Sequence, residues 1–311
     1  RQMCIRDRAI HGGAGTLVKG LMTEALESQY KKTLKRALET GYRALEQGGS
    51  ALDVAEMAVK SLEDSPLFNA GKGAVFTAEG THEMDASIMD GRTLKAGAVS
   101  LVTGIKNPVA LARDVMEKSN HVFLAGEGAL QFAKTNGYEI ESPEYFYDEL
   151  RYQQWQEIKG SEGFQLDHSV KKDSKFGTVG AVVCDKYGNI AAATSTGGMT
   201  NKKWGRVGDS PMVGAGVYAN NKTCAVSCTG SGEFFIRGVV AYDVSCLIEH
   251  KGLSLKEAAN EVIYNRILKI NGDGGLIAVD SKGNIAMPFN TEGMYRACKS
   301  ASGIEEISIY K

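Results

Sequence analysis

The feature that most constrains this chain is the apolar run Val179–Val183, which has the length and composition of a buried strand and directly follows Gly177 and Thr178. Residues 151–176 before it are polar, charged and without hydrophobic period, as is typical of an exposed segment that can be cut. Cleavage before Thr178 would leave one residue with both a hydroxyl and a free α-amine. Because an α-amine has a pKa of about 7.7 to 8.0, it can accept the hydroxyl proton near neutral pH. Taken alone, a Gly-Thr pair before a strand is more often an ordinary turn.

Composition and charge narrow the class of protein. The chain has 311 residues, of which 43% are apolar and 23% charged, enough for one large α/β domain or two small ones. Its 36 Lys and Arg nearly balance 37 Asp and Glu, so net charge indicates neither a nucleic-acid nor a membrane partner. No run approaches the roughly 18 apolar residues of a membrane helix, and the start lacks the apolar core of a signal peptide. We therefore expect a cytoplasmic protein that binds a small neutral or zwitterionic ligand.

The cysteines and the first eight residues give little indication of function. Six cysteines are too few for a disulfide scaffold, and we expect buried, reduced thiols. Cys224 and Cys228 lack the second Cys or His pair that a zinc site needs. Residues 1–8 are not typical of a strand and are a candidate for an extension foreign to the native start.

Periodicity predicts the elements of the first half. Ala9–His11 predicts a short strand that ends in a glycine turn at Gly12–Gly15. Residues 68–103 alternate and predict strands, with a hairpin turn at Glu79-Gly80. Amphipathic spacing and caps predict helices over 23–47, from a Ser50 cap onward, after Asn107-Pro108, and over about 126–135.

Beyond Thr178 the pattern predicts mostly strands. Asp185–Ala191 recurs weakly as Asp280–Ala286, and both copies predict a hairpin turn between adjacent strands. Between them we expect helices over 236–250 and 254–268, the second opened by the capping box Ser254–Glu257. Strands gathered at 178–230 and 276–287, with helices before and between them, predict sheets covered by helices in one compact domain.

Glycine is enriched, with 37 residues in clusters that allow backbone amides to approach a ligand. One cluster, Gly214–Gly216, lacks the full three-glycine fingerprint and the following helix of a dinucleotide loop. The serine-hydrolase elbow G-x-S-x-G is absent, so His11–Gly13 is not supported as a lipase-type oxyanion loop.

From about Ala9 to its end, the chain resembles the plant-type asparaginase and isoaspartyl aminopeptidase family of N-terminal-nucleophile hydrolases. Six motifs in family order carry the resemblance: Ile10–Gly15, Leu67–Gly73, Gly177–Val182, Thr194–Gly198, Gly205–Pro211 and Cys228–Glu233. The resemblance implies an α+β fold, an αββα sandwich of two stacked, mostly antiparallel sheets covered by helices, in a single domain over 1–311. It also implies that the chain cuts itself into 1–177, with a flexible tail at 151–176, and 178–311.

The resemblance also implies roles for the reacting groups. Thr178 is the nucleophile, first for the Gly177 carbonyl and then for the substrate amide, and Gly177 tolerates the strained backbone that this attack needs. Thr196 is expected to hydrogen-bond the hydroxyl of Thr178. Thr229, through its hydroxyl, and Gly230, through its N–H, form an oxyanion hole, where one lost donor raises the barrier by about 3 to 4 kcal/mol.

Substrate anchoring is implied in the same way. Arg206 clamps the substrate α-carboxylate in a bidentate fork, and Asp209, helped by the Gly232 carbonyl, holds the α-ammonium. Asn69 positions the cut strand end. Without the neighbouring motifs, Arg206 and Asp209 would instead indicate a surface ion pair worth under about 1 kcal/mol. His11 is expected to have a structural hydrogen-bonding role rather than acid–base duty.

One loop of the family wraps a structural sodium ion, mostly with backbone carbonyls, as suits a hard cation. The corresponding residues here are Leu62, Glu63, Ser65, Phe68, Ala70 and Lys72. Lys72 stands where an apolar residue is common, and a nearby ammonium would weaken the site.

The expected activity is hydrolysis of L-asparagine and β-aspartyl dipeptides through an acyl-enzyme on Thr178, without an organic cofactor, in a homodimer of cleaved protomers. A glycosylasparaginase-like amidase is one alternative, although that branch usually has Asp and Ile where Gly177 and Val179 flank the nucleophile here. An unprocessed relative that only binds small amino acids is the other. Both expected substrates present the same aspartyl half, so the sequence does not rank them.

Overall fold

The computed structural model describes residues 7–160 and 177–311. The strands are β1 (Asp7–Gly15), β2 (Met84–Asp90), β3 (Ala96–Val102), β4 (Phe123–Ala125), β5 (Val179–Cys184), β6 (Ile190–Thr196), β7 (Val217–Ala219), β8 (Ala225–Gly230), β9 (Gly274–Val279), β10 (Ile285–Ala286), β11 (Gly293–Lys299) and β12 (Glu305–Tyr310). The helices are α1 (Glu24–Glu46), α2 (Ala51–Glu63), α3 (Pro108–Lys118), α4 (Gly126–Thr135), α5 (Pro143–Phe146), α6 (Glu149–Ile158), α7 (Gly232–Gly238), α8 (Val240–Lys251), α9 (Leu255–Glu261) and α10 (Ile267–Lys269), with a 3-10 turn η1 (Gly71–Gly73) and a π-helical turn η2 (Val262–Arg266).

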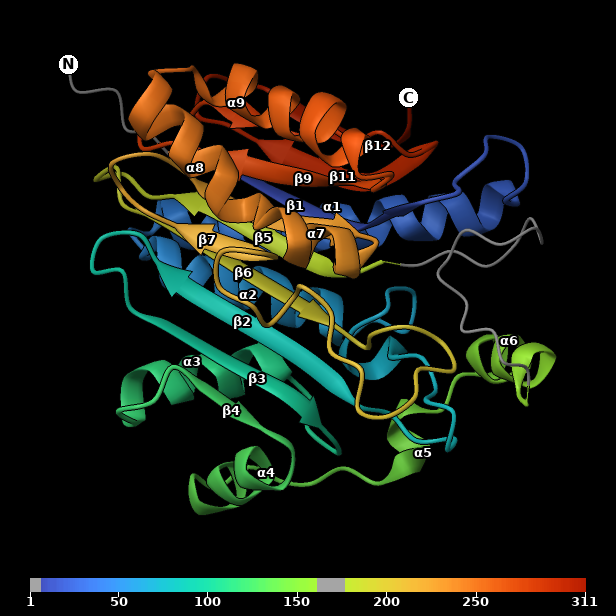
Figure 1. Ribbon diagram of the computed structural model, residues 1–311. Helices are drawn as coiled ribbons and strands as arrows, with labels where there is room; N and C mark the ends of the chain where they lie inside the picture. The colour runs from blue at the N-terminus through green and yellow to red at the C-terminus, as the bar shows by residue number, and fades with distance from the viewer. Residues whose placement is uncertain (1–6, 161–176) are drawn as a thin grey trace.

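The described strands form two sheets, of eight strands in the order β12-β11-β1-β5-β6-β2-β3-β4 and of four in the order β10-β9-β8-β7. Their named pairs are antiparallel except β3 with β4. Helices α1, α2 and α3 pack on the large sheet, α8 and α9 on the small one, and the sheets face each other (Figure 1). The expected α+β class with two mostly antiparallel sheets is therefore confirmed, and its layers run helix, sheet, sheet, helix.

Apolar side chains fill the space between each pair of layers. One buried cluster lies between α1–α3 and the large sheet, a second between the sheets, and a third between the small sheet and the helices α8 and α9. Along β5, Val179, Ala181 and Val183 belong to the first cluster and Val182 and Cys184 to the second. Because side chains alternate along a strand, Thr178 falls on the side of β5 that faces the small sheet.

Local chemistry places several elements as predicted. Thr23, Ser50 and Ser254 accept backbone N–H bonds at the starts of α1, α2 and α9, and the Ser254–Glu257 capping box is complete. The two similar sequences form equivalent hairpin turns, between β5 and β6 and between β9 and β10. In each turn an aspartate, Asp185 or Asp280, accepts the N–H groups two and four residues later.

The start of the chain differs from the prediction. Strand β1 includes Asp7 and Arg8 and continues through Gly12–Gly15 after a bulge between His11 and Gly13, instead of ending in a glycine turn. Pairing with β5 on one side and β11 on the other holds this whole segment extended. Residues 1–6 lie outside the described residues.

Three further expectations are wrong because tertiary contacts override local pattern. Glu79-Gly80 is a turn, but the hairpin joins β2 to β3 at Asp90–Lys95. The helix expected over 236–250 breaks at Val239, which has φ +47°. It breaks because the N–H groups of Ala241 and Tyr242 donate to the carbonyls of Ala215 and Gly214 in another loop. The first residues of 151–176 belong to α6, where Trp155 is buried and stacks on Phe76, with ring centroids 5.4 Å apart. The rest of that segment lies outside the described residues.

Cys184, Cys224, Cys228 and Cys298 are buried and unpaired, as expected, and Cys246 is half-buried. In the part of the chain that the structure describes, no helix has the length and apolar character needed to cross a bilayer.

Candidate active site

Thr178 lies at the start of β5, buried between the sheets with 7% of its surface exposed. Its hydroxyl is 3.1 Å from the hydroxyl of Ser210. Ser210 follows Asp209 in the loop after β6, and Ser87 of β2 donates to its carbonyl at 2.5 Å. The nucleophile expected from the sequence is therefore held by a serine to which sequence reasoning assigned no role, although Ser210 belongs to the motif Gly205–Pro211.

Gly177, the residue before the predicted cut, sits against β1 and β8. A Cβ on Gly177 would collide with the hydroxyl oxygen of Thr229 and lie 3.1 Å from the Ala14 nitrogen. A Cβ on Gly13 would in turn lie 2.7 Å from the Gly177 nitrogen. The structure thus gives a steric reason for glycine at both positions, because the Gly177 backbone lies directly against Gly13 and against the Thr229 hydroxyl.

Thr229 and Gly230 end strand β8 opposite this backbone. The Thr229 hydroxyl accepts the Ala14 N–H at 3.2 Å, which leaves its own hydrogen free to donate. Gly230 has φ +148°, and a Cβ there would collide with the Asp273 carbonyl, so this position requires glycine. The expected oxyanion donors and the scissile residue therefore meet at one place.

Thr196 ends β6, the strand beside β5. Its hydroxyl accepts the N–H of Gly198 at 3.1 Å and so shapes the turn that follows. The hydroxyl partner of Thr178 in the structure is Ser210 and not Thr196, which differs from the expected contact. Asn69 supports the same turn, since its amide donates to the Gly198 carbonyl at 2.7 Å and accepts the Val75 N–H at 3.2 Å.

Arg206 and Asp209 converge on Gly232. A Cβ on Gly232 would lie 2.9 Å from both Arg206 Nη2 and Asp209 Oδ1, so glycine keeps open a gap between the guanidinium and the carboxyl group. The expected alternative, a surface ion pair between Arg206 and Asp209, is wrong, because Asp209 is 3% exposed and Arg206 pairs elsewhere. Arg206 Nε and Nη2 donate to the two carboxylate oxygens of Glu233 at 2.8 and 2.9 Å.

This fork changes how Arg206 can bind a ligand. With Nε and one hydrogen of Nη2 used by Glu233, the Nη1–Nη2 edge remains for a substrate carboxylate. Sequence reasoning did not assign Glu233 a role, although it closes the motif Cys228–Glu233. Asp209 Oδ2 is buried without a partner among the described residues, and burial raises the pKa of Asp209 to about 7 against the lowering effect of Arg206.

A buried polar network ties the two sheets together beneath Thr178. His11 Nε2 lies 2.9 Å from the Ser227 hydroxyl, which lies 2.7 Å from the Thr194 hydroxyl. Burial lowers the pKa of His11 to about 3, so this imidazole is neutral at pH 7. The expected structural role of His11 fits these contacts.

The loop predicted to wrap a cation brings carbonyl oxygens onto two glycines of η1. A Cβ on Gly71 would lie 2.5 Å from the Glu63 carbonyl oxygen, and a Cβ on Gly73 would collide with that of Phe68. The Lys72 ammonium lies 5.3 Å from the centre of the Tyr145 ring, in a cation–π contact. The carbonyl contacts require glycine at both positions of η1, and the Phe68 carbonyl also accepts the Ala70 N–H at 2.9 Å.

Comparison with known proteins agrees with this arrangement. The model of the asparaginase family matches residues 7–309. An isoaspartyl peptidase of Escherichia coli (strain K12) is 54% identical over 306 residues, covering 97% of this chain and 95% of the relative. The plant-type L-asparaginase of Pyrococcus horikoshii is 42% identical over 311 residues, covering 96% and 97%. Because the family model and these relatives span nearly the whole chain, this protein belongs to the asparaginase family.

Proposed function

We propose that this chain is an autoprocessing threonine hydrolase of the N-terminal-nucleophile class that releases ammonia from L-asparagine and cleaves β-aspartyl dipeptides. The observation that carries the proposal is the position of Thr178 directly before β5, with its hydroxyl 3.1 Å from that of Ser210 and with Gly177 beside it packed against the Thr229 hydroxyl. Names of relatives, such as isoaspartyl peptidase and plant-type L-asparaginase, support the same substrates.

In the first step, the Thr178 oxygen attacks the Gly177 carbonyl carbon, and the amide nitrogen of Thr178 leaves as an amine. Water then hydrolyses the resulting ester, which frees the Gly177 carboxylate and restores the Thr178 hydroxyl. Close packing of Gly177 on Gly13 and Thr229 holds the carbonyl in place for this attack, and the Thr229 hydroxyl donates to the oxyanion.

Substrate hydrolysis follows the same path. The free α-amine of Thr178 takes the hydroxyl proton as the oxygen attacks the side-chain amide carbon, and Thr229 and Gly230 stabilise the oxyanion. The proton passes to the leaving nitrogen, which departs as ammonia or as the amine of the second residue. Water then releases aspartate from the acyl ester. The gap over Gly232 orients the substrate, with its α-carboxylate at Arg206 and its α-ammonium at Asp209.

Thr178→Ala tests this proposal directly. We expect purified protein to separate on a denaturing gel into fragments 1–177 and 178–311, and the second to begin Thr-Val-Gly on amino-terminal sequencing. The variant lacks the hydroxyl needed for both steps, so it should stay whole and release no ammonia from asparagine. A cleaved Thr178→Ala protein would mean that an external protease makes the cut.

We also propose that the loop of Leu62, Glu63, Ser65, Phe68, Ala70 and Lys72 binds sodium through its carbonyls. Sodium should then raise the melting temperature above that in caesium at equal ionic strength, because a ligand that binds only the folded state stabilises it. Equal melting temperatures in the two salts would exclude a selective site.

Two further proposals concern the protein in the cell. We propose a cytoplasmic enzyme, supported by the unpaired cysteines Cys184, Cys224, Cys228 and Cys298, since reducing compartments keep thiols free.

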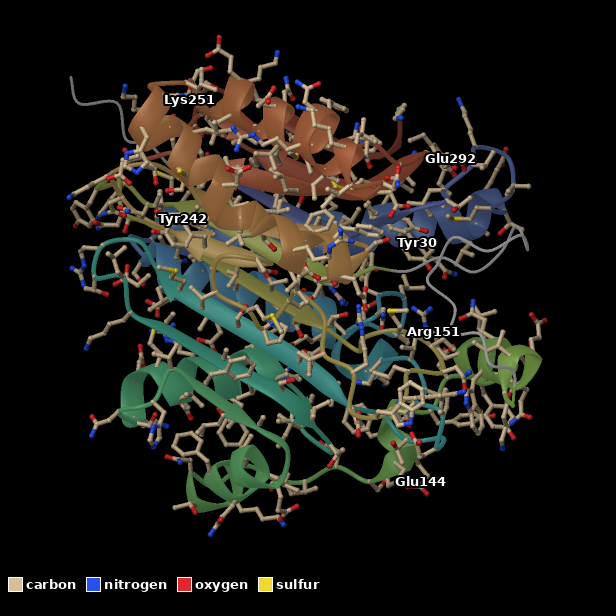
Figure 2. The ribbon with its side chains drawn as sticks, in the orientation of Figure 1. Tyr30, Glu144, Arg151, Tyr242, Lys251 and Glu292 are labelled. Atoms are coloured by element: carbon tan, nitrogen blue, oxygen red, sulfur yellow. The ribbon has the colours of Figure 1, made fainter. Side chains whose placement is uncertain are left out.

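We also propose a homodimer of cleaved protomers. Its support is an exposed apolar patch of Val213, Val239 and Tyr242, in which Tyr242 lies on α8 at the surface (Figure 2) and packs on the half-buried Tyr218.

A further inference from the structure

A buried carboxylate lies under the substrate-binding loop without touching the reacting groups. Asp85 of β2 is fully buried and pairs in register with Thr196 of β6. Its neighbours Met84 and Ala86 face the helices α1–α3, so alternation points Asp85 to the other face of the sheet, toward the loop that follows β6. No step of the mechanism uses this side chain.

Asp85 holds a β-bulge together. Between β2 and β3 the register passes from Met84–Val102 to Ala86–Val99, so Ser100 and Leu101 together face Asp85 alone. Asp85 Oδ1 accepts the Ser100 hydroxyl at 2.7 Å and the Leu101 N–H at 2.9 Å. These bonds replace the ladder contact that the bulge interrupts, and they keep Leu101 at φ +55°, a conformation that a leucine rarely adopts.

The bulge directs Leu101 toward the residue before Arg206. A Cβ built on Gly205 would lie 3.4 Å from Leu101 Cδ1, which is ordinary van der Waals contact. Arg206 follows directly, with its guanidinium in the fork to Glu233. The position of Leu101 therefore supports the backbone from which the substrate-anchoring arginine extends.

The other end of the same loop is tied to the same strand region. Lys202 is 2% exposed, and its ammonium donates to the Glu83 carbonyl at 3.1 Å and lies 3.3 Å from the Glu83 carboxylate. Loop 198–206 is thus pinned at Lys202 by the residue before β2 and supported at Gly205 by the bulge that pairs with β2.

We propose that Asp85 is a positioning residue for substrate binding. By holding the Ser100–Leu101 bulge, it fixes the position of the Gly205 backbone and therefore the position of the Arg206 guanidinium. This inference rests on the proposed function, because it takes Arg206 to bind the substrate α-carboxylate. It assigns Asp85 no part in proton transfer or in self-cleavage.

Binding of the product L-aspartate, measured by calorimetry on cleaved enzyme, tests the inference without depending on turnover. Asp85→Ala removes the acceptor of two buried hydrogen bonds, and we expect its Kd and KM to rise about tenfold or more while kcat stays within about threefold. Asp85→Asn keeps an acceptor oxygen at Oδ1 and should bind within about threefold of the parent. Asp90→Ala is the matched control, since Asp90 ends the same strand and accepts the Arg92 N–H at 3.1 Å in the distant hairpin.

Leu101→Ala keeps the test decisive if Asp85→Ala does not fold. It removes the side chain that lies against Gly205 and should also weaken aspartate binding. The double variant, Asp85→Ala with Leu101→Ala, should have a Kd no higher than that of the weaker-binding single variant, because both changes act through one contact. Unchanged Kd in folded Asp85→Ala or Leu101→Ala, a loss confined to kcat, or additive losses would each overturn the inference. Failure of the parent enzyme to bind aspartate would instead count against the proposed function.

Discussion

Asp209 is a carboxyl whose charge depends on the ligand beside it. In the ligand-free protein, burial raises its pKa from 3.8 to about 7, so folding favours the protonated form. Because the pKa of Asp209 is higher in the folded than in the unfolded protein, its protonated carboxyl favours folding. This contribution to the free energy of unfolding is fully present below pH about 3.8 and is lost as the pH rises through about 7. A substrate α-ammonium in the gap over Gly232 supplies an opposite charge and favours the ionised form.

Binding should therefore release a proton from Asp209. At pH about 6, we expect calorimetric titration with L-aspartate to show proton release, read from the difference between two buffers of unlike ionisation enthalpy. Asp209→Asn has no proton to lose, so it should bind more weakly and without this component. Equal proton release in parent and variant would assign the titration to another group, such as the Thr178 α-amine.

At the scale of the element, β5 combines a nucleophile with a strand that must fit between two layers. Gly180, two residues after Thr178, leaves room for the polar network below, since a Cβ there would collide with the Ser227 hydroxyl and the His11 ring. On the face of β5 toward the helices, apolar side chains are sufficient, but on the face toward the small sheet only a glycine at position 180 leaves room for the polar network.

Gly180→Ala should destabilise the protein by about 1 to 3 kcal/mol, the usual cost of overpacking a buried site, and should lower the melting temperature by several degrees. Gly128→Ala is the control, because Gly128 lies in α4, where an added Cβ would meet nothing within 4 Å, and the change should stabilise by up to about 1 kcal/mol. Differential scanning fluorimetry compares the two. A melting temperature of Gly180→Ala equal to the parent's would contradict the described packing.

At the scale of the whole molecule, the exposed patch of Val213, Val239 and Tyr242 is expected to join two protomers. Light scattering after gel filtration should give about twice the protomer mass of 33.3 kDa. Tyr242→Glu places a charge in the patch and should shift the protein to the monomer, whereas Tyr187→Glu changes a tyrosine that is 75% exposed outside it. A dimer that survives Tyr242→Glu would place the interface elsewhere.

The amino-acid sequence by itself determined whatever depends on neighbours along the chain. Caps at Thr23, Ser50 and Ser254 need only a hydroxyl within three residues of the N–H that it accepts, and the Asp185 and Asp280 turns close over four residues. The apolar run Val179–Val183 is a property of consecutive residues, so it predicted the buried strand behind Thr178. The six motifs pointed to the family for the same reason, because each is a short local pattern.

Tertiary structure alone decided which side chains meet. The contact between Thr178 and Ser210 spans 32 residues, and the fork between Arg206 and Glu233 spans 27, so no local pattern contains either pair. The same holds for α6, whose Trp155 is buried against Phe76, and for β1, held extended by β5 and β11. A buried bulge such as that of Ser100 and Leu101 exists only where two strands are already paired, because one residue must face two.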